Sequence, residues 1–267
     1  MRWMVILLLA LASPFGCDES APKAARSGAA DRVVSFSPAI TATLVELGLG
    51  GRVRGRTPWC KGVGDAPVVG SLEEVDLEQI AAIDPDLVLV QRTSRGVPEE
   101  LQWIADRRGW RVETVPGDSL EDMRSMGATL ARLCDLHGGD AGLAARWERL
   151  LARPPGVRAD EKVVFLMPGD PPRAFGGGSY LADLWQAWGG KAWPDARGWP
   201  EIQLEDLVAA HPQRVFVVGG EASPALVQAL AGAGMKVASL PDAGFLQPGP
   251  EFLRAAEAWR TELERRP

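Results

Sequence analysis

A motif that occurs twice in the chain constrains its fold more than any other feature. Residues 77–90 read LEQIAAIDPDLVLV, and residues 204–217, 127 positions later, read LEDLVAAHPQRVFV. In each copy, apolar residues at helical spacing precede a proline and a nearly continuous apolar run follows it. Because proline cannot continue a helix, each copy predicts a short helix followed by a buried strand. The repeat therefore predicts two similar lobes, with Glu78 and Glu205 at equivalent places in the first turn of an exposed helix.

The rest of the chain alternates predicted strands with predicted helices, which indicates parallel sheets. The 267 residues suit two α/β units of about 100 to 130 residues each. We therefore predict an α/β fold of two Rossmann-like lobes with central parallel sheets, joined by a single long helix. The predicted N-terminal lobe is 31–137, the connecting helix is 138–158 and the C-terminal lobe is 159–267. Helix-forming residues from Asp140 to Leu151, ended by Pro154-Pro155-Gly156, locate the connecting helix.

The first residues have the composition of an export signal. One positive charge precedes an apolar run from Val5 to Ala12, and Gly16 stands directly before Cys17. This arrangement resembles the lipobox of bacterial lipoproteins, in which the cysteine is lipidated after cleavage, although Pro14 stands where leucine is usual. We predict a signal peptide over 1–16, lipidation of Cys17 and a flexible linker over 17–30, with a plain cleaved signal as the alternative. The protein is then extracytoplasmic and anchored to the membrane.

Cysteine and histidine content limits what the mature chain can bind directly. Cys60 and Cys134 are its cysteines after Cys17, and an oxidising compartment permits them to pair. The alternative is a buried free thiol, because Cys134 lies among apolar residues of a predicted amphipathic helix. With only His137 and His211 besides, we expect no metal site and no cofactor. The net charge of −6 and the scattered basic residues also argue against a nucleic-acid partner.

Several short motifs, taken in order, resemble one known family. They are Ser37-Pro38-Ala39-Ile40-Thr41, the first repeat copy, Gly189-Gly190, Trp199-Pro200, Glu205 and Val217-Val218-Gly219-Gly220. This set is similar to the substrate-binding proteins of ABC importers for vitamin B12 and iron siderophores. The resemblance covers about residues 31 to 265. It implies a monomer that captures a small metal chelate between two lobes and delivers it to the transmembrane subunits of an ABC transporter.

The resemblance also implies roles for particular residues. In the family, one exposed glutamate on each lobe docks onto arginines of the transmembrane subunits, and the matching positions here are Glu78 and Glu205. A glutamate in a first helical turn is also favoured by the helix dipole alone. The ligand is expected in a cleft formed by loops at strand ends. The candidate contacts, chosen by loop position, are Trp59, Cys60, Gln91, Arg92, Met167, Phe175, Tyr180, Trp199, Phe245 and Gln247.

The sequence leaves the identity of the ligand open. A Trp-Pro at the place of Trp199 lines the pocket of the B12-binding relatives. Those relatives also carry tryptophans where this chain has Leu72 and Gln91, and an arginine where it has Gln247. Cobalamin, a related corrinoid, a ferric siderophore and haem therefore all remain candidates. The chain has few side chains that could ligate haem iron directly, since Tyr180 is the only tyrosine and His137 and His211 are the only histidines.

Enzymatic motifs are incomplete. Residues 177–181 (GGSYL) lack the second glycine of a nucleophile elbow, and residues 48–53 (GLGGRV) lack the third glycine of a dinucleotide fingerprint. We therefore predict that the protein is not an enzyme. A ligand-sensing lipoprotein and a secreted hydrolase are the alternatives from other functional classes.

Overall fold

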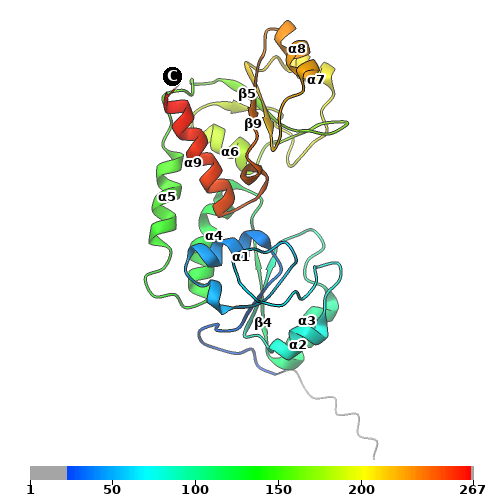
Figure 1. Ribbon diagram of the computed structural model, residues 1–267, viewed down its shortest axis with the longest axis vertical. Coiled ribbons are helices and arrows are strands. Elements are labelled where there is room, and N and C mark those ends of the chain that lie inside the picture. Colours follow the sequence, from blue (N-terminus) through cyan, green and yellow to red (C-terminus); the bar gives the residue numbers. More distant parts are fainter. Residues whose placement is uncertain (1–22, 266–267) are drawn as a thin grey trace, which may run out of the picture.

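The structure is a computed structural model that describes residues 23–265, apart from the side chain of Ala225. The predicted signal peptide and Cys17 lie outside the described residues. Two α/β lobes are stacked along the long axis of the molecule, with a group of helices along one side of both (Figure 1). In the part of the chain that is described, no helix combines the length and apolar character needed to cross a membrane.

The N-terminal lobe is built on a parallel sheet with the strand order β2-β1-β3-β4. Its strands are β1 (Val33–Ser35), β2 (Val53–Arg56), β3 (Leu87–Gln91) and β4 (Arg111–Val115). Its helices are α1 (Pro38–Glu46), α2 (Leu77–Ile83) and α3 (Glu99–Arg108), with a 3-10 turn, η1, at Gly50–Arg52.

Alternation along the N-terminal strands directs side chains to both faces of the sheet. Leu87 and Leu89 pack under α1, whereas Val88 and Val90 pack under α2 and α3. Because both faces are covered, the central strands β1 and β3 are apolar at nearly every position.

The C-terminal lobe repeats this arrangement. Its strands are β5 (Lys162–Met167), β6 (Arg173–Ala174), β7 (Lys191–Ala192), β8 (Arg214–Val218) and β9 (Lys236–Leu240). Its helices are α6 (Tyr180–Ala187), α7 (Leu204–Ala210), α8 (Pro224–Gly232) and α9 (Pro250–Arg265), with a 3-10 turn, η2, at Ala243–Leu246. The parallel pairs β7-β5, β5-β8 and β8-β9 give the same order as in the first lobe, and β6 is an added antiparallel strand. The two-lobed α/β fold predicted from the repeat is confirmed.

The two repeat copies also end alike. Each helix, α2 and α7, has seven residues and ends at a residue in the left-handed region, Asp84 with φ 50° and His211 with φ 47°. Proline follows in both cases. The left-handed residue turns the chain away from the helix axis so that the next segment enters the sheet as β3 or β8.

Two further helices join the lobes. α4 (Leu120–Leu133) packs its first turn, with Leu120 and Met123, into the core of the C-terminal lobe. Its later residues, including Leu130, pack into the core of the N-terminal lobe. α5 (Ala141–Leu151) then carries the chain to the C-terminal lobe and packs against α4 and α9 (Figure 1). The helix within the predicted connecting segment 138–158 is thus 11 residues long, and α4 shares its bridging role.

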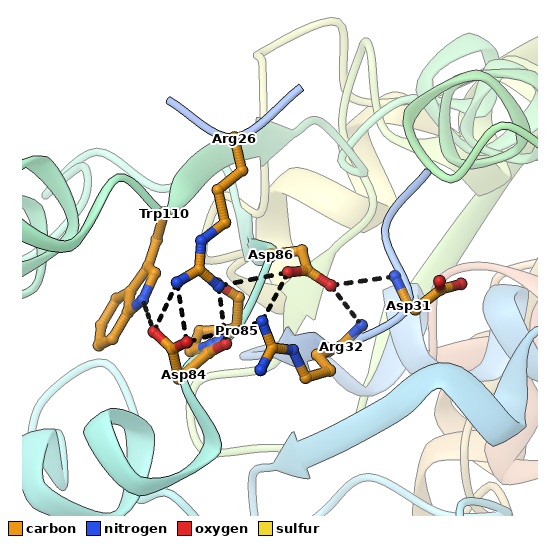
Figure 2. Close-up of polar contacts among 7 residues, drawn as sticks. All are labelled: Arg26, Asp31, Arg32, Asp84, Pro85, Asp86 and Trp110. Carbon is orange, nitrogen blue, oxygen red and sulfur yellow. Dashed lines mark hydrogen bonds and ion pairs between the residues drawn. The ribbon is translucent and has the colours of Figure 1, made fainter. Parts of the chain in front are cut away.

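The segment expected to be a flexible linker is partly bound to the N-terminal lobe. We expected 17–30 to lack fixed structure, but the described part, 23–30, lies along the end of the sheet. Arg26 donates hydrogen bonds to both carboxylate oxygens of Asp84, at 2.8 Å each, and to the carbonyl oxygens of Asp84 and Pro85 (Figure 2). Ala30 is fully buried. The small, polar composition of the segment gave no sign of these contacts, because one arginine makes most of them.

Candidate functional site

A groove of about 520 Å³ lies between the two lobes. Its N-terminal wall is formed by α1, by the loop that follows β2 and by the last residue of β3. Its C-terminal wall is formed by the end of η2 and the first turns of α9. The side chains that define the walls are Pro38, Ala42, Val45, Trp59, Lys61 and Gln91 on one side, and Leu246, Gln247, Glu251 and Arg254 on the other. The groove thus occupies the carboxyl edge of the N-terminal sheet, where open α/β sheets bind ligands.

Ser37 fixes the start of α1 against the end of β3. Its hydroxyl oxygen accepts a hydrogen bond from the backbone N–H of Ile40 at 3.3 Å, and its O–H donates to Gln91 Oε1 at 2.8 Å. Pro38 begins the helix, where the missing N–H of proline costs nothing. Both Pro38 and Gln91 are therefore held in place in the N-terminal wall of the groove.

A buried polar cluster supports the loop that carries Trp59. The Thr41 hydroxyl lies 2.9 Å from Ser35 Oγ and 3.0 Å from Cys60 Sγ, and the Thr57 hydroxyl lies 3.2 Å from the same sulfur. Cys60 is thus an internal contact that fastens the loop and leaves Trp59 directed outward with 62% of its surface exposed.

Charged side chains behind the groove are mostly paired with each other. Arg146 of α5 binds Glu46 of α1 and Glu257 of α9. Arg254 binds Glu251 at 3.1 Å and reaches Glu46 at 3.6 Å. Among the described residues Lys61 makes no ion pair, which leaves it as a cation available to a ligand.

The structure brings together some of the predicted ligand contacts. Trp59, Gln91 and Gln247 line the groove. Met167 instead lines a second hollow of about 440 Å³ within the C-terminal lobe, between the end of β5 and α7. Arg92 and Trp199 are exposed but line neither cavity.

Four other predicted contacts are buried in the core: Cys60, Phe175, Tyr180 and Phe245. Tyr180 donates a hydrogen bond to the carbonyl oxygen of Phe245 at 2.9 Å, and its ring packs edge-on against Phe175. Burial raises the pKa of the Tyr180 hydroxyl, which stays protonated. These residues were chosen because they stand in or beside loops at strand ends, but the loops turn inward there and complete the core.

Sequence reasoning missed much of the groove, including Ala42, Val45 and Arg254. One signal was present, since Ser37-Pro38 directly follows a strand and marks the first strand-to-helix turn of an α/β unit. No comparable signal preceded η2, because its four residues are too few to show a periodic pattern.

The chain matches one protein family over most of its length. Residues 33–261 match the family described as periplasmic binding protein. The chain belongs to this family. A comparison of this periplasmic binding protein with curated protein sequences finds no match.

Solved structures share the fold at low identity. The vitamin B12 binding protein BtuF of Vibrio cholerae has a TM-score of 0.67 and 17% identity, over 88% of this chain and 97% of that one. The heme binding protein HutB of Vibrio cholerae has a TM-score of 0.71 and 16% identity, over 87% and 98%. A possible iron-binding protein of Staphylococcus epidermidis has a TM-score of 0.70 and 16% identity, over 88% and 99%. At such identities the likeness shows the fold of this periplasmic binding protein.

The two repeat glutamates occupy equivalent exposed positions. Glu78 is the second residue of α2 and Glu205 is the second residue of α7. Within residues 23–265 neither carboxylate pairs with a basic side chain. The helices that carry them lie at opposite ends of the periplasmic binding protein (Figure 1). A partner that contacts both glutamates must therefore span both lobes.

Proposed function

We propose that the protein is the substrate-binding lipoprotein of an ABC importer, which captures a metal chelate between its lobes and delivers it to the permease. The observation that carries the proposal is the groove walled by both lobes, with Trp59 and Gln91 on one side and Gln247 on the other. Its volume of about 520 Å³ is within the usual range for small-molecule sites. The family match and the capture of B12, heme or iron named for similar structures support the same class of ligand.

The lining favours a chelate whose metal is already fully coordinated. No histidine, tyrosine, methionine or cysteine is among the described residues that line the groove. Tyr180, the only tyrosine of the chain, is buried and hydrogen-bonded elsewhere. A haem iron in this groove would lack an axial ligand of these kinds. A corrinoid or a ferric siderophore, which supplies its own metal ligands, fits the lining better than haem.

Delivery would use the two exposed glutamates. We infer that Glu78 and Glu205 bind basic residues of the two transmembrane subunits, so that one contact on each lobe sets the register of docking. Cys17, as the site of lipidation, would keep the protein at the outer face of the membrane that holds the permease.

Titration of the purified full chain tests the proposal. Cyanocobalamin, a ferric hydroxamate siderophore and hemin are titrated separately, with calorimetry as the readout. We expect saturable one-site binding of cyanocobalamin or the siderophore, and weaker binding of hemin. Trp59→Ala should weaken the Kd about fivefold or more, because the indole supplies about 1 kcal/mol or more of contact.

Trp103→Ala is the matched control, since Trp103 is 60% exposed but lies on α3, outside the groove lining. Its Kd should equal that of the unmodified chain. A ligand site in the groove would be contradicted if none of the three chelates binds, or if both tryptophan variants lose affinity equally.

A further inference from the structure

The described chain begins beside the last turn of α3. The backbone N–H of Lys23 donates to the carbonyl oxygen of Asp106, and that of Arg26 donates to the carbonyl oxygen of Gly109, both at 3.0 Å. Arg26 then ties the segment to Asp84 at the end of α2 (Figure 2). Lys23 follows Cys17 by six residues, which span about 20 Å at most when extended. The end of α3 therefore stays close to whatever holds Cys17.

The outer surface of α3 near this point combines an aromatic ring with cations. Trp103 is 60% exposed, and the guanidinium carbon of Arg107 lies 4.7 Å from the centre of its ring. Arg108, the last residue of the helix, is also exposed. The acidic residues Glu99 and Glu100 lie in the first turn of the helix, four and three residues before Trp103 and on the same side, whereas the cations lie in its last turn. Asp106 is the acid nearest the cations, and Gln102 donates a hydrogen bond to it.

We propose that the surface formed by Trp103, Arg107 and Arg108, here called the α3 face, rests on the lipid bilayer that anchors Cys17. This inference rests on the lipid anchor of the proposed function. An indole ring is amphipathic and favours the membrane–water interface, and guanidinium groups attract anionic head groups. Three features occur together at this end of α3: a short connection to the anchor, an exposed aromatic ring and a basic last turn. Together they point to a lipid bilayer as the surface that the α3 face contacts.

Contact through the α3 face would orient the N-terminal lobe. α2 and α3 cover the same face of the sheet, with Ile80 and Leu101 in one core cluster. The helix that carries Glu78 would thus be held near the bilayer in which the permease lies. Restricting the protein to the membrane surface raises its effective concentration for docking.

Quenching by brominated lipid tests the proposal. The full, processed chain is reconstituted into vesicles of phosphatidylcholine and phosphatidylglycerol, with acyl chains brominated or not, and tryptophan emission is compared. We expect brominated lipid to quench part of the emission. Trp103→Phe should abolish that quenching, and the double change Arg107→Glu and Arg108→Glu should reduce it, as should high salt.

Trp59→Phe is the matched control, because Trp59 is 62% exposed but lines the groove. It should leave the quenching unchanged. If the chain stays with the vesicles but Trp103→Phe does not change the quenching, the proposed contact of the α3 face with the bilayer is wrong, and the lipid anchor is still supported. If the chain does not stay with the vesicles, both the lipid anchor of the proposed function and the contact of the α3 face with the bilayer are wrong.

Discussion

At the scale of single residues, Arg26 connects the N-terminal segment to the acidic turn between α2 and β3. Asp84 accepts hydrogen bonds from Arg26 and from the indole N–H of Trp110, and Asp86 accepts from Arg32 (Figure 2). Burial raises the pKa of each carboxyl group. The hydrogen bonds and the nearby guanidinium groups act in the opposite direction and outweigh it, so that both pKa values lie below the ordinary value of 3.8.

Lowered pKa values make the contribution of this cluster depend on pH. Below the ordinary pKa the unfolded chain binds more protons than the folded chain, so stability falls as pH falls. The stabilisation that ionised Asp84 and Asp86 provide is therefore complete above about pH 5 and is lost as pH falls below about 4. Arg26→Ala should lower the free energy of unfolding at pH 7 by about 1–2 kcal/mol, because the bonds are charge-assisted but about a third exposed.

Urea unfolding of both proteins at a series of pH values from 7 to 3 measures the effect. The difference in free energy of unfolding between the unmodified protein and Arg26→Ala should become smaller as Asp84 and Asp86 are protonated. Lys61→Ala, which removes an exposed cation that makes no ion pair among the described residues, serves as the control and should change stability little at any pH. A constant difference down to pH 3 would show that the Arg26 contacts do not depend on ionised aspartates.

At the scale of elements, α2 and α7 are the parts of the molecule that we expect to meet the permease. Changing both Glu78 and Glu205 to alanine should leave ligand Kd unchanged, since neither lines the groove. It should lower ligand uptake by cells about tenfold or more, because loss of two interfacial charge pairs costs at least about 1.4 kcal/mol. Each single change should have a smaller effect.

Glu100→Ala is the control for docking, because Glu100 is also an exposed glutamate in the first turn of a helix, on α3. Uptake of radiolabelled ligand, measured beside calorimetric Kd values, separates docking from binding. Unchanged uptake in the double variant would contradict the docking role and leave the groove as the part of the proposal still supported.

Sequence patterns predicted the elements well but the site only in part. Each repeat copy predicted a buried strand after its proline, and β3 and β8 stand at those places. The two-residue strands β6 and β7 were missed because no pattern can be read from so few residues. Loop position predicted Trp59 and Gln247 at the groove but also named the buried Phe175, since a sequence does not show which way a loop side chain turns.

At the scale of the whole molecule, the lobes share a layer of helices. α4 contributes side chains to the cores of both lobes, and α9 packs against α1 and α5. Gly249 lies where α9 begins, and a β-carbon placed there would stand 3.4 Å from the carbonyl oxygen of Ala39 in α1. Because the same helices pack into or against both lobes, ligand capture should involve only small closure.

Arg146 is the polar centre of this layer, because it joins α5 to Glu46 in one lobe and to Glu257 in the other. The three side chains are between 21% and 33% exposed. Arg146→Ala should therefore lower the free energy of unfolding by about 1–3 kcal/mol and lower the Tm, measured by calorimetry, by about 2–8 °C. Because the lobes share α4, we expect one transition in both proteins.

Arg124 of α4 offers a matched comparison, since it also joins two helices by binding Glu148 of α5, besides Glu121 of its own helix. These glutamates are 64% and 68% exposed. Solvent screens such pairs, so Arg124→Ala should change stability by about 1 kcal/mol or less. Equal Tm values for the two arginine variants would show that Arg146 does not hold the lobes together. Two separate transitions in the unmodified protein would show that the shared helices do not couple the unfolding of the lobes, and closure on ligand binding would then be expected to be larger.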